Sequence, residues 1–170
     1  MPRRNDEVDR IVEAWQRERP DLDVSPLQVL SRVTRLARHL DRSRAAAFAA
    51  HGLETWEFDV LAALRRVGAP YQLSPGQLVA QTMVTSGTMT NRIDRLTGRG
   101  LVQRLPDPAD GRGVMVLLEP KGRVLVDGAM ADLLQIEDGV LARLPSADRE
   151  QLAQLLRELL TGLDPPPAAE

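Results

Sequence analysis

The order of helix and turn signals between residues 74 and 118 constrains the fold of this chain more than any other feature. Ser74-Pro-Gly-Gln77 begins a helix of about seven residues, with Ser as the N-cap, Pro at the first helical position and Gln three residues after the cap. A tight turn follows at residues 83–88, where a Thr or Ser can cap the next helix. That second helix runs from about Ser86 to Arg99 and ends at Gly100. Two short helices around a tight turn predict a helix-turn-helix.

Two short, β-rich apolar runs come directly after the second helix. They occupy residues 101–105 and 114–118, and the residues between them are mostly turn-forming Pro, Asp and Gly. This pattern predicts a β-hairpin, and a hairpin in this position is a wing. Asp107 and Asp110 in the turn are expected to hold wing arginines or to cap the turn, because phosphate would repel them.

Helical periodicity and breakers divide the rest of the chain. Apolar residues recur at helical spacing in residues 6–19, and Ser25-Pro-Leu-Gln28 predicts a capped helix that extends to about Ala50. Further helices are expected at 53–67, 120–144 and 146–162. The predicted fold is mainly α with a small β-hairpin wing: a winged helix-turn-helix with N- and C-terminal dimerisation helices. Its parts are an extra helix and linker (1–24), a scaffold helix (25–52), the winged helix-turn-helix (53–118), two dimerisation helices (119–163) and a disordered tail (164–170).

Composition excludes several classes of protein. The chain has 170 residues and no cysteine, which excludes a disulfide scaffold, a thiol nucleophile, an iron–sulfur site and a cysteine redox sensor. No apolar run approaches the ~18 residues of a spanning helix, and the polar start lacks the apolar core of a signal peptide. We therefore expect a cytoplasmic protein with no membrane contact. His39 and His51 are expected to cap helices or face solvent, and we predict no metal site and no cofactor.

Charge is distributed unevenly along the chain, although the net charge is only −2. Residues 25–48 contain five basic and one acidic residue, whereas residues 119–170 contain five basic and ten acidic residues. An acidic protein can bind DNA when its positive charge is gathered on one face, although such runs can also be ordinary solvated helix faces.

The second helix of the predicted motif has the composition of a helix that enters the major groove of DNA. Met89, Ile93 and Leu96 form one apolar face. Small hydroxyl and amide side chains crowd its first turns and arginines follow, as close approach to base edges and phosphates requires. Arg112, between two glycines at the wing tip, suits the minor groove. The alternatives are an ordinary surface helix and a solvated hairpin tip. The predicted DNA-binding residues are Thr85, Ser86, Thr88, Thr90, Asn91, Arg92, Arg95, Arg99 and Arg112.

These motifs together resemble the MarR family of bacterial repressors over about residues 25–162. The resemblance is carried by Gln77-Leu-Val-Ala80, by residues 85–96, by Gly100-Leu-Val-Gln-Arg104 and by the wing as far as Asp110-Gly-Arg112, after which Gly113 stands where many members have another polar residue. It implies a homodimer, formed by interlocking terminal helices, that represses transcription by binding a pseudo-palindromic site in double-stranded DNA.

A narrower resemblance is to the urate-responsive branch of that family. The extra first helix carries Trp15, and Asp59, Arg66 and Arg92 stand at matching positions. The resemblance implies that these four residues bind a small anionic aromatic effector, urate, that releases the protein from DNA. The chemistry also fits, because a planar anion suits an aromatic wall and a cationic fork, and Asp59 beside it would create a repulsion that a switch can use. The alternative is that Trp15 packs in the dimer core and the charged residues form surface ion pairs.

Other functions are open at this point. The effector could instead be a phenolic acid or a small tricarboxylate. A winged helix can also be a protein-interaction module, which would lack salt-dependent DNA binding. An enzyme such as a methyltransferase is disfavoured, because no Gly-rich nucleotide loop follows a strand and nothing after residue 118 indicates a parallel-sheet domain. We therefore predict that the chain is not an enzyme.

Overall fold

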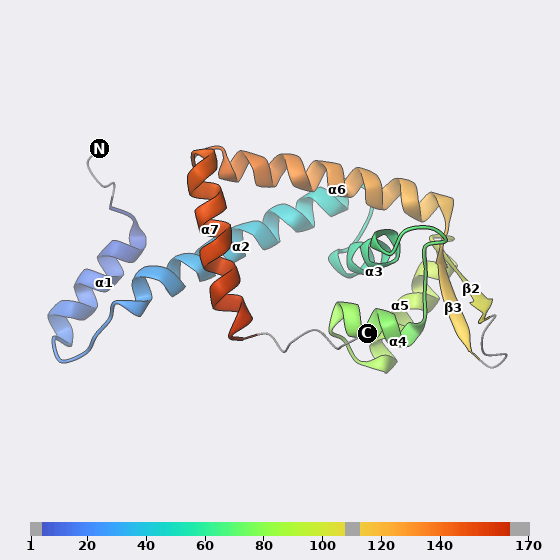
Figure 1. Ribbon diagram of the computed structural model, residues 1–170, viewed down its shortest axis with the longest axis horizontal. Coiled ribbons are helices and arrows are strands. Elements are labelled where there is room, and N and C mark those ends of the chain that lie inside the picture. Colours follow the sequence, from blue (N-terminus) through green and yellow to red (C-terminus); the bar gives the residue numbers. More distant parts are fainter. Residues whose placement is uncertain (1–4, 108–112, 164–170) are drawn as a thin grey trace.

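The computed structural model describes residues 5–107 and 113–163, and these residues form a mainly helical chain with one small sheet (Figure 1). The elements are α1 (Glu7–Glu18), α2 (Pro26–Ala50), α3 (Thr55–Arg66), β1 (Gln72–Leu73), α4 (Pro75–Thr82), α5 (Ser86–Gly98), β2 (Val102–Pro106), β3 (Val114–Leu118), α6 (Pro120–Leu141) and α7 (Ser146–Thr161). The predicted mainly α fold with a β wing is confirmed. The tail at 164–170, predicted to be disordered, lies outside the described residues.

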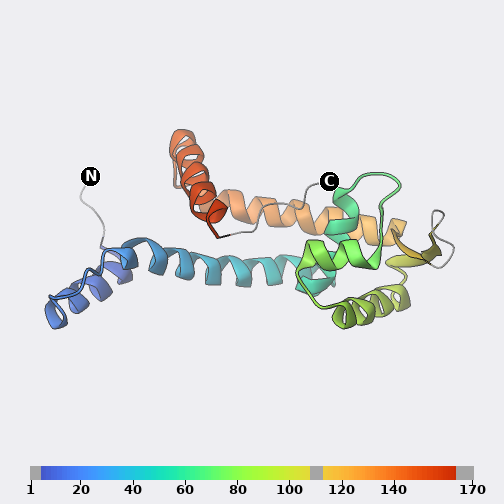
Figure 2. The ribbon, with the colours of Figure 1, turned by 60° about the horizontal axis from the view of Figure 1, so that its bottom comes forward.

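The molecule is elongated, because its two longest helices, α2 and α6, extend in opposite directions from the region where the second half of α2 packs on α6. The group formed by α3, α4, α5 and the sheet lies at one end of these helices, and α1 lies at the opposite end of α2 (Figures 1 and 2). Helix α7 turns away from the end of α6. Within the described ranges, no helix combines the length and the apolar character that crossing a membrane requires.

One apolar core holds the winged part together and fastens it to the long helices. Leu61 and Leu64 of α3 are completely buried with Leu78 of α4 and Met89 and Leu96 of α5. The rings of Phe48 and Phe58 stack with centroids 3.9 Å apart, which joins the end of α2 to α3. Because α6 contributes Val126, Ala129 and Leu133 to the same core, the helix-turn-helix packs directly on α6 as well as on the end of α2.

Polar contacts add to the packing between α2 and α6. Nε2 of His51, where α2 ends, lies 2.7 Å from the Asp132 carboxylate of α6. The imidazole packs closely on α6: a Cβ at Gly128 would lie 2.7 Å from His51 Cε1, so any larger residue there would require the imidazole to shift. Nη2 of Arg44 donates to Glu137 over 2.9 Å further along the same pair of helices.

The sheet contains one more strand than the sequence predicts. Strands β2 and β3 form the expected antiparallel hairpin, with Arg104 opposite Val116. The short strand β1 pairs with the other edge of β3, with Leu73 opposite Val116. Two residues are too few to show an alternating pattern, so the sequence contains no periodic signal for β1.

The capping predictions have mixed outcomes. At α4 the capping box is confirmed, because Ser74 Oγ accepts from the Gln77 N–H and Gln77 Oε1 accepts from the Ser74 N–H. At α2 the prediction is wrong. Ser25 is itself in the helical region and makes no side-chain cap; its N–H and Oγ donate to the Asp23 carboxylate over 2.9 and 3.0 Å. Ser25 has a helical backbone instead of the extended conformation of an N-cap residue, and its hydroxyl is turned toward Asp23, so Oγ does not accept from the first turn of α2.

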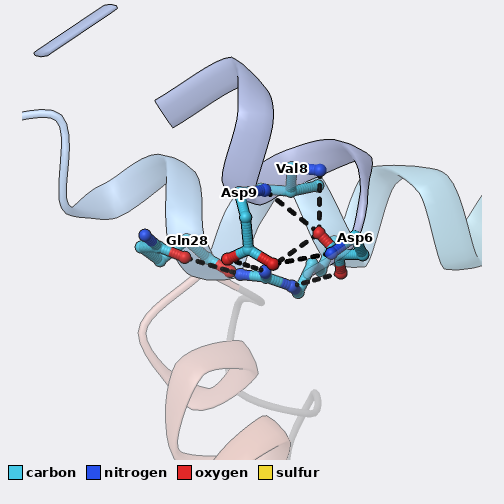
Figure 3. A network of polar contacts seen from close by, with 5 residues as sticks. Asp6, Val8, Asp9 and Gln28 are labelled. Carbon is cyan, nitrogen blue, oxygen red and sulfur yellow. Dashed lines mark hydrogen bonds and ion pairs between the residues drawn. The ribbon is translucent and has the colours of Figure 1, made fainter. Parts of the chain in front are cut away.

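Helix α1 is held on α2 by a small apolar cluster and an arginine clamp. Val8 and Val12 of α1 are buried with Val24. The Arg32 guanidinium of α2 donates to both Asp6 oxygens over 2.9 and 3.0 Å and to Asp9 over 2.8 Å (Figure 3). The hydrogen bonds from Arg32 are the main reason that the pKa of Asp6 falls from its ordinary 3.8 to about 2. Since this pKa is depressed by folding, the contribution of Asp6 is complete above pH 3.8 and is lost as the pH falls toward 2.

We predict that Arg32→Gln loosens α1, because the neutral amide cannot hold two carboxylates. Backbone amides of residues 7–18 should exchange hydrogen for deuterium about 3- to 10-fold faster, while the winged part keeps its protection. Arg38→Gln is the matched control, because Arg38 lies on the same helix and has no ion pair among the described residues. Equal exchange in the parent and Arg32→Gln would show that the apolar cluster alone anchors α1.

Candidate nucleic-acid interface and ligand site

Helix α5 presents one buried face and one exposed polar face. Met89, Ile93 and Leu96 are buried, as predicted. The Thr85 hydroxyl caps the helix by accepting from the Thr88 N–H over 3.3 Å. Because the apolar face is fixed in the core, the opposite face points to solvent. The exposed residues on it include Thr85, Ser86, Thr88, Thr90, Asn91, Arg95 and Arg99, and Arg92 is half-buried.

The arginines of α5 converge on the first turn of α3. Trp56 lies beneath two of them, with the Cζ of Arg95 4.6 Å and that of Arg92 5.5 Å from the ring centroid. Nη2 of Arg95 also donates to Glu54 over 2.6 Å. Trp56, Gly87, Thr88, Asn91, Arg92 and Arg95 line a pocket of about 400 Å³ on this surface.

Arg99 differs from the other arginines because its guanidinium, although partly exposed, binds a buried carboxylate and a backbone carbonyl. Nη1 donates to Glu57, whose side chain is 2% exposed, and Nη2 donates to the Gly52 carbonyl over 2.9 Å. Arg99 therefore neutralises a buried carboxylate. Its predicted contact with DNA stays a prediction, and the structure shows a structural role that the sequence pattern does not indicate.

An ion pair joins the wing to α5, and a backbone hydrogen bond connects its two strands just beyond β2 and β3. Arg104 of β2 pairs with Asp94 of α5 over 2.8 Å, and the Asp107 N–H donates to the Gly113 carbonyl over 3.0 Å. Arg112 and Asp110 lie outside the described residues. The minor-groove contact of Arg112 therefore stays a prediction.

Three of the four predicted ligand residues, Asp59, Arg66 and Arg92, are near enough for their charges to interact. Partial burial raises the pKa of Asp59, and the positive charges of Arg92, Arg44 and Arg66 act in the opposite direction. Arg44 was not among the predicted residues. Its position 15 residues before Asp59, on another helix, leaves no sequence pattern that could reveal the proximity.

Trp15 lies apart from the other three predicted ligand residues within one chain. It is on α1, at the end of α2 opposite to α3 (Figures 1 and 2), and Trp15 is 48% exposed. Within a single chain, Asp59 therefore lies in the field of three arginines, and Trp15 does not provide the predicted aromatic wall beside it.

Glu54 and Trp56 are the residues of this surface that sequence analysis missed. Each contacts arginines more than 30 residues later in the chain, so helical spacing cannot connect them. One signal was available: the chain has only two tryptophans, and Trp56 stands in the first turn of an amphipathic helix, where a buried position is not expected.

A helix-turn-helix followed by an antiparallel wing, with hydroxyl, amide and guanidinium groups on the exposed face of its second helix, defines a winged-helix DNA-binding protein. Comparison with known proteins gives the family. Residues 51–113 match the MarR family. The chain is 37% identical to the HTH-type transcriptional regulator PecS of Dickeya dadantii (strain 3937) over 150 residues, which cover 88% of this chain and 90% of PecS. The chain therefore belongs to the MarR family of transcriptional regulators.

Solved structures agree with this assignment. A mutant of Escherichia coli MarR in complex with operator DNA has a TM-score of 0.67 and 25% identity, and the match covers 82% of this chain and 99% of that one. BpsR of Bordetella bronchiseptica, from a study of how 6-hydroxynicotinic acid regulates its DNA binding, has a TM-score of 0.58 and 32% identity, with 75% and 98% of the two chains covered. These relatives are regulators rather than enzymes.

We predict that Arg99→Ala lowers the free energy of unfolding by about 2–3 kcal/mol, because it leaves the buried Glu57 carboxylate without its cation. Arg99 is partly exposed, so the expected loss is below that of a fully buried pair. Urea unfolding followed by circular dichroism, at one fixed protein concentration, measures the change. In a Glu57→Gln background the same substitution should cost far less; equal costs in both backgrounds would contradict the role given to this ion pair.

Proposed function

We propose that this protein is a homodimeric repressor that binds a pseudo-palindromic operator and is released by a small anionic aromatic effector, with urate as the leading candidate. The observation that carries the DNA part is the exposed face of α5. Its hydroxyls, amide and two accessible guanidiniums stand on a helix whose other face is fixed in the core. Such a helix can enter the major groove without changing its own packing.

Exposed apolar side chains support the dimer. Val29, Leu30 and Val33 are exposed near the start of α2, and Leu155 and Leu159 are exposed on α7. A groove of about 790 Å³ runs between these helices and the start of α1. Contiguous apolar surface of this kind marks an interface, and a second copy would bury it. Two recognition helices would then lie about one DNA turn, ~34 Å, apart.

The ligand part of the proposal rests on the charges around Asp59. Three arginines attract an anion to this position, and Asp59 repels it, so a bound anion changes the local balance. In the free protein the attraction between Asp59 and Arg92 helps to hold α5 in place. An anion on Arg66 would displace the carboxylate and, through Arg92, disturb the recognition helix. Because Trp15 is distant within its own chain, we expect the aromatic wall to come from the second copy.

Relatives leave two effector chemistries to compare. The resemblance to the urate-responsive branch favours urate, and PecS is the regulator matched over most of the chain. BpsR is studied with 6-hydroxynicotinic acid, a small aromatic acid, which supports an aromatic carboxylate as the second candidate. Thermal shifts with urate, 6-hydroxynicotinate, salicylate and citrate separate them, since a ligand at 100 times its Kd adds ~2.7 kcal/mol to stability.

The DNA-binding experiment begins with selection of duplexes by the parent protein from a randomised pool. Binding should be salt-dependent, and light scattering should show two chains on each selected duplex. Arg95→Ala should cost about 1–3 kcal/mol and relax the preference at one position in each half-site. Arg112→Ala should weaken binding evenly and lower the salt slope by about 1. A monomer at micromolar concentration, or unchanged affinity in both variants, would contradict the proposal.

The effector experiment titrates urate into protein bound to a selected duplex. A ~10- to 100-fold loss of DNA affinity corresponds to a coupling of about 1.4–2.7 kcal/mol. Arg66→Ala should bind DNA normally but lose the urate response, and Asp59→Asn should bind urate but respond weakly, since the repulsion is gone. Trp15→Phe should weaken urate binding only modestly.

Arg65→Ala is the matched control for the ligand site, because Arg65 is the neighbouring arginine and pairs with Asp127 of α6 instead. It should respond to urate as the parent does. If Arg66→Ala leaves DNA at the same urate concentration as the parent, the ligand site is misplaced.

A further inference from the structure

We propose that Glu54 and Trp56 of α3's first turn are positioning residues for DNA recognition: they hold the Arg95 guanidinium so that it reads a base edge rather than any nearby phosphate. The proposal rests on the proposed DNA-binding function. It adds two residues that contribute to sequence discrimination through Arg95 without themselves being assigned a DNA contact.

One carboxylate holds both the arginine and the aromatic ring beneath it. Glu54 Oε1 accepts from Nη2 of Arg95 over 2.6 Å, and Glu54 Oε2 accepts from the indole Nε1 of Trp56 over 2.7 Å. The Arg95 Cζ lies 4.6 Å from the Trp56 ring centroid. The guanidinium is thus held by a hydrogen bond on one side and by a cation–π contact on one face.

Glu54, which holds Arg95, is itself connected to the core through Glu57. Glu54 is the N-cap of α3, and its N–H donates to the buried Glu57 carboxylate over 2.9 Å. Glu57 is tied in turn to Arg99, one helical turn beyond Arg95 on α5. The position of the Glu54 backbone relative to α5 is therefore set by buried contacts.

A held arginine differs in selectivity from a free one. A mobile guanidinium can reach many phosphate oxygens, which carry no sequence information. A guanidinium with one donor bound to Glu54 and one face on Trp56 keeps its other donors in a narrow range of directions. It can therefore form a good pair with one base edge and a poor pair elsewhere, and less rotamer entropy is lost on binding.

The negative charge of Glu54 also favours contact of Arg95 with a base edge over contact with phosphate. The hydrogen bond from Trp56, followed by that from Arg95, lowers the pKa of Glu54, so this carboxylate is ionised at neutral pH. A fixed negative charge beside Arg95 repels phosphates and so opposes binding to arbitrary DNA. It has less effect on a neutral base edge, so it increases the difference between the two modes of contact.

The test uses the full chain and the duplex that the parent selects from a randomised pool, with every base pair substituted in turn. Arg95→Ala identifies the base pair that Arg95 reads: substitution there should cost the parent about 5- to 100-fold in affinity and should cost Arg95→Ala almost nothing. At that base pair, Glu54→Gln should reduce the parent's discrimination by about 5-fold or more, with discrimination elsewhere unchanged. The amide has one acceptor oxygen, so it cannot bind Trp56 and Arg95 as the carboxylate does.

Asp94→Asn is the matched control. The Asp94 and Glu54 side chains are both 58% exposed, and each pairs with an arginine. Each substitution removes one negative charge from the interface. Asp94 pairs with Arg104 rather than Arg95, so Asp94→Asn should keep the parent's discrimination at the Arg95 base pair. A general charge effect would tighten binding to all duplexes in both variants and leave the discrimination intact.

Trp56→Phe provides a second variant that keeps an aromatic face but removes the indole N–H that orients Glu54. It should lose part of the same discrimination, while circular dichroism shows that it is folded at the temperature of the binding assay. Parent-like discrimination by Glu54→Gln overturns the proposal, as does an equal loss at every base pair. If the parent itself shows no salt-dependent, selective binding, the proposed function fails first and this inference fails with it.

Discussion

The ion pair between buried Glu57 and Arg99 is the contact on which the arrangement of the winged part depends. Glu57 is 1% exposed and lies in the first turn of α3, whereas Arg99 is at the end of α5. The same guanidinium reaches the Gly52 carbonyl, where the chain turns from α2 into α3. One arginine therefore joins three helices, and without it a desolvated carboxylate would remain in the core.

The first turn of α3 consequently connects the two candidate sites. It carries Glu54 and Glu57, which hold two arginines of the recognition helix, and Asp59 follows within the next turn. A ligand that moves Asp59 acts on the same helix that positions Arg95. The coupling proposed here therefore requires no long route through the protein, only a small displacement of α3 against α5, two helices already in the same core.

Local chemistry made much of the fold predictable, and long-range contacts account for what was missed. Ser74 and Gln77 form the expected cap, and the buried face of Met89, Ile93 and Leu96 follows from spacing alone. Strand β1 was missed because two residues carry no period. At Ser25 the backbone is helical and the hydroxyl is turned toward Asp23, so the expected cap does not form. The roles of Glu57, Trp56 and Arg44 depend on residues far away in the sequence, and the position of Trp15 depends on how α1 packs on α2, which no local pattern contains.

Burial distinguishes the two arginine–glutamate pairs between α3 and α5: one maintains the fold, and the other lies on the surface proposed to bind DNA. Arg95 and Arg99 are four residues apart on α5, and their partners Glu54 and Glu57 are three apart at the start of α3. The first pair has side chains 54% and 58% exposed, so the Arg95 donors that Glu54 does not bind stay accessible to DNA. In the second pair Glu57 is sealed from water, and any competitor for Arg99 would have to leave that carboxylate unpaired in the core. The winged part therefore contains one accessible arginine, Arg95, beside one structural arginine, Arg99, and the Glu57–Arg99 pair fixes the Glu54 backbone that positions Arg95.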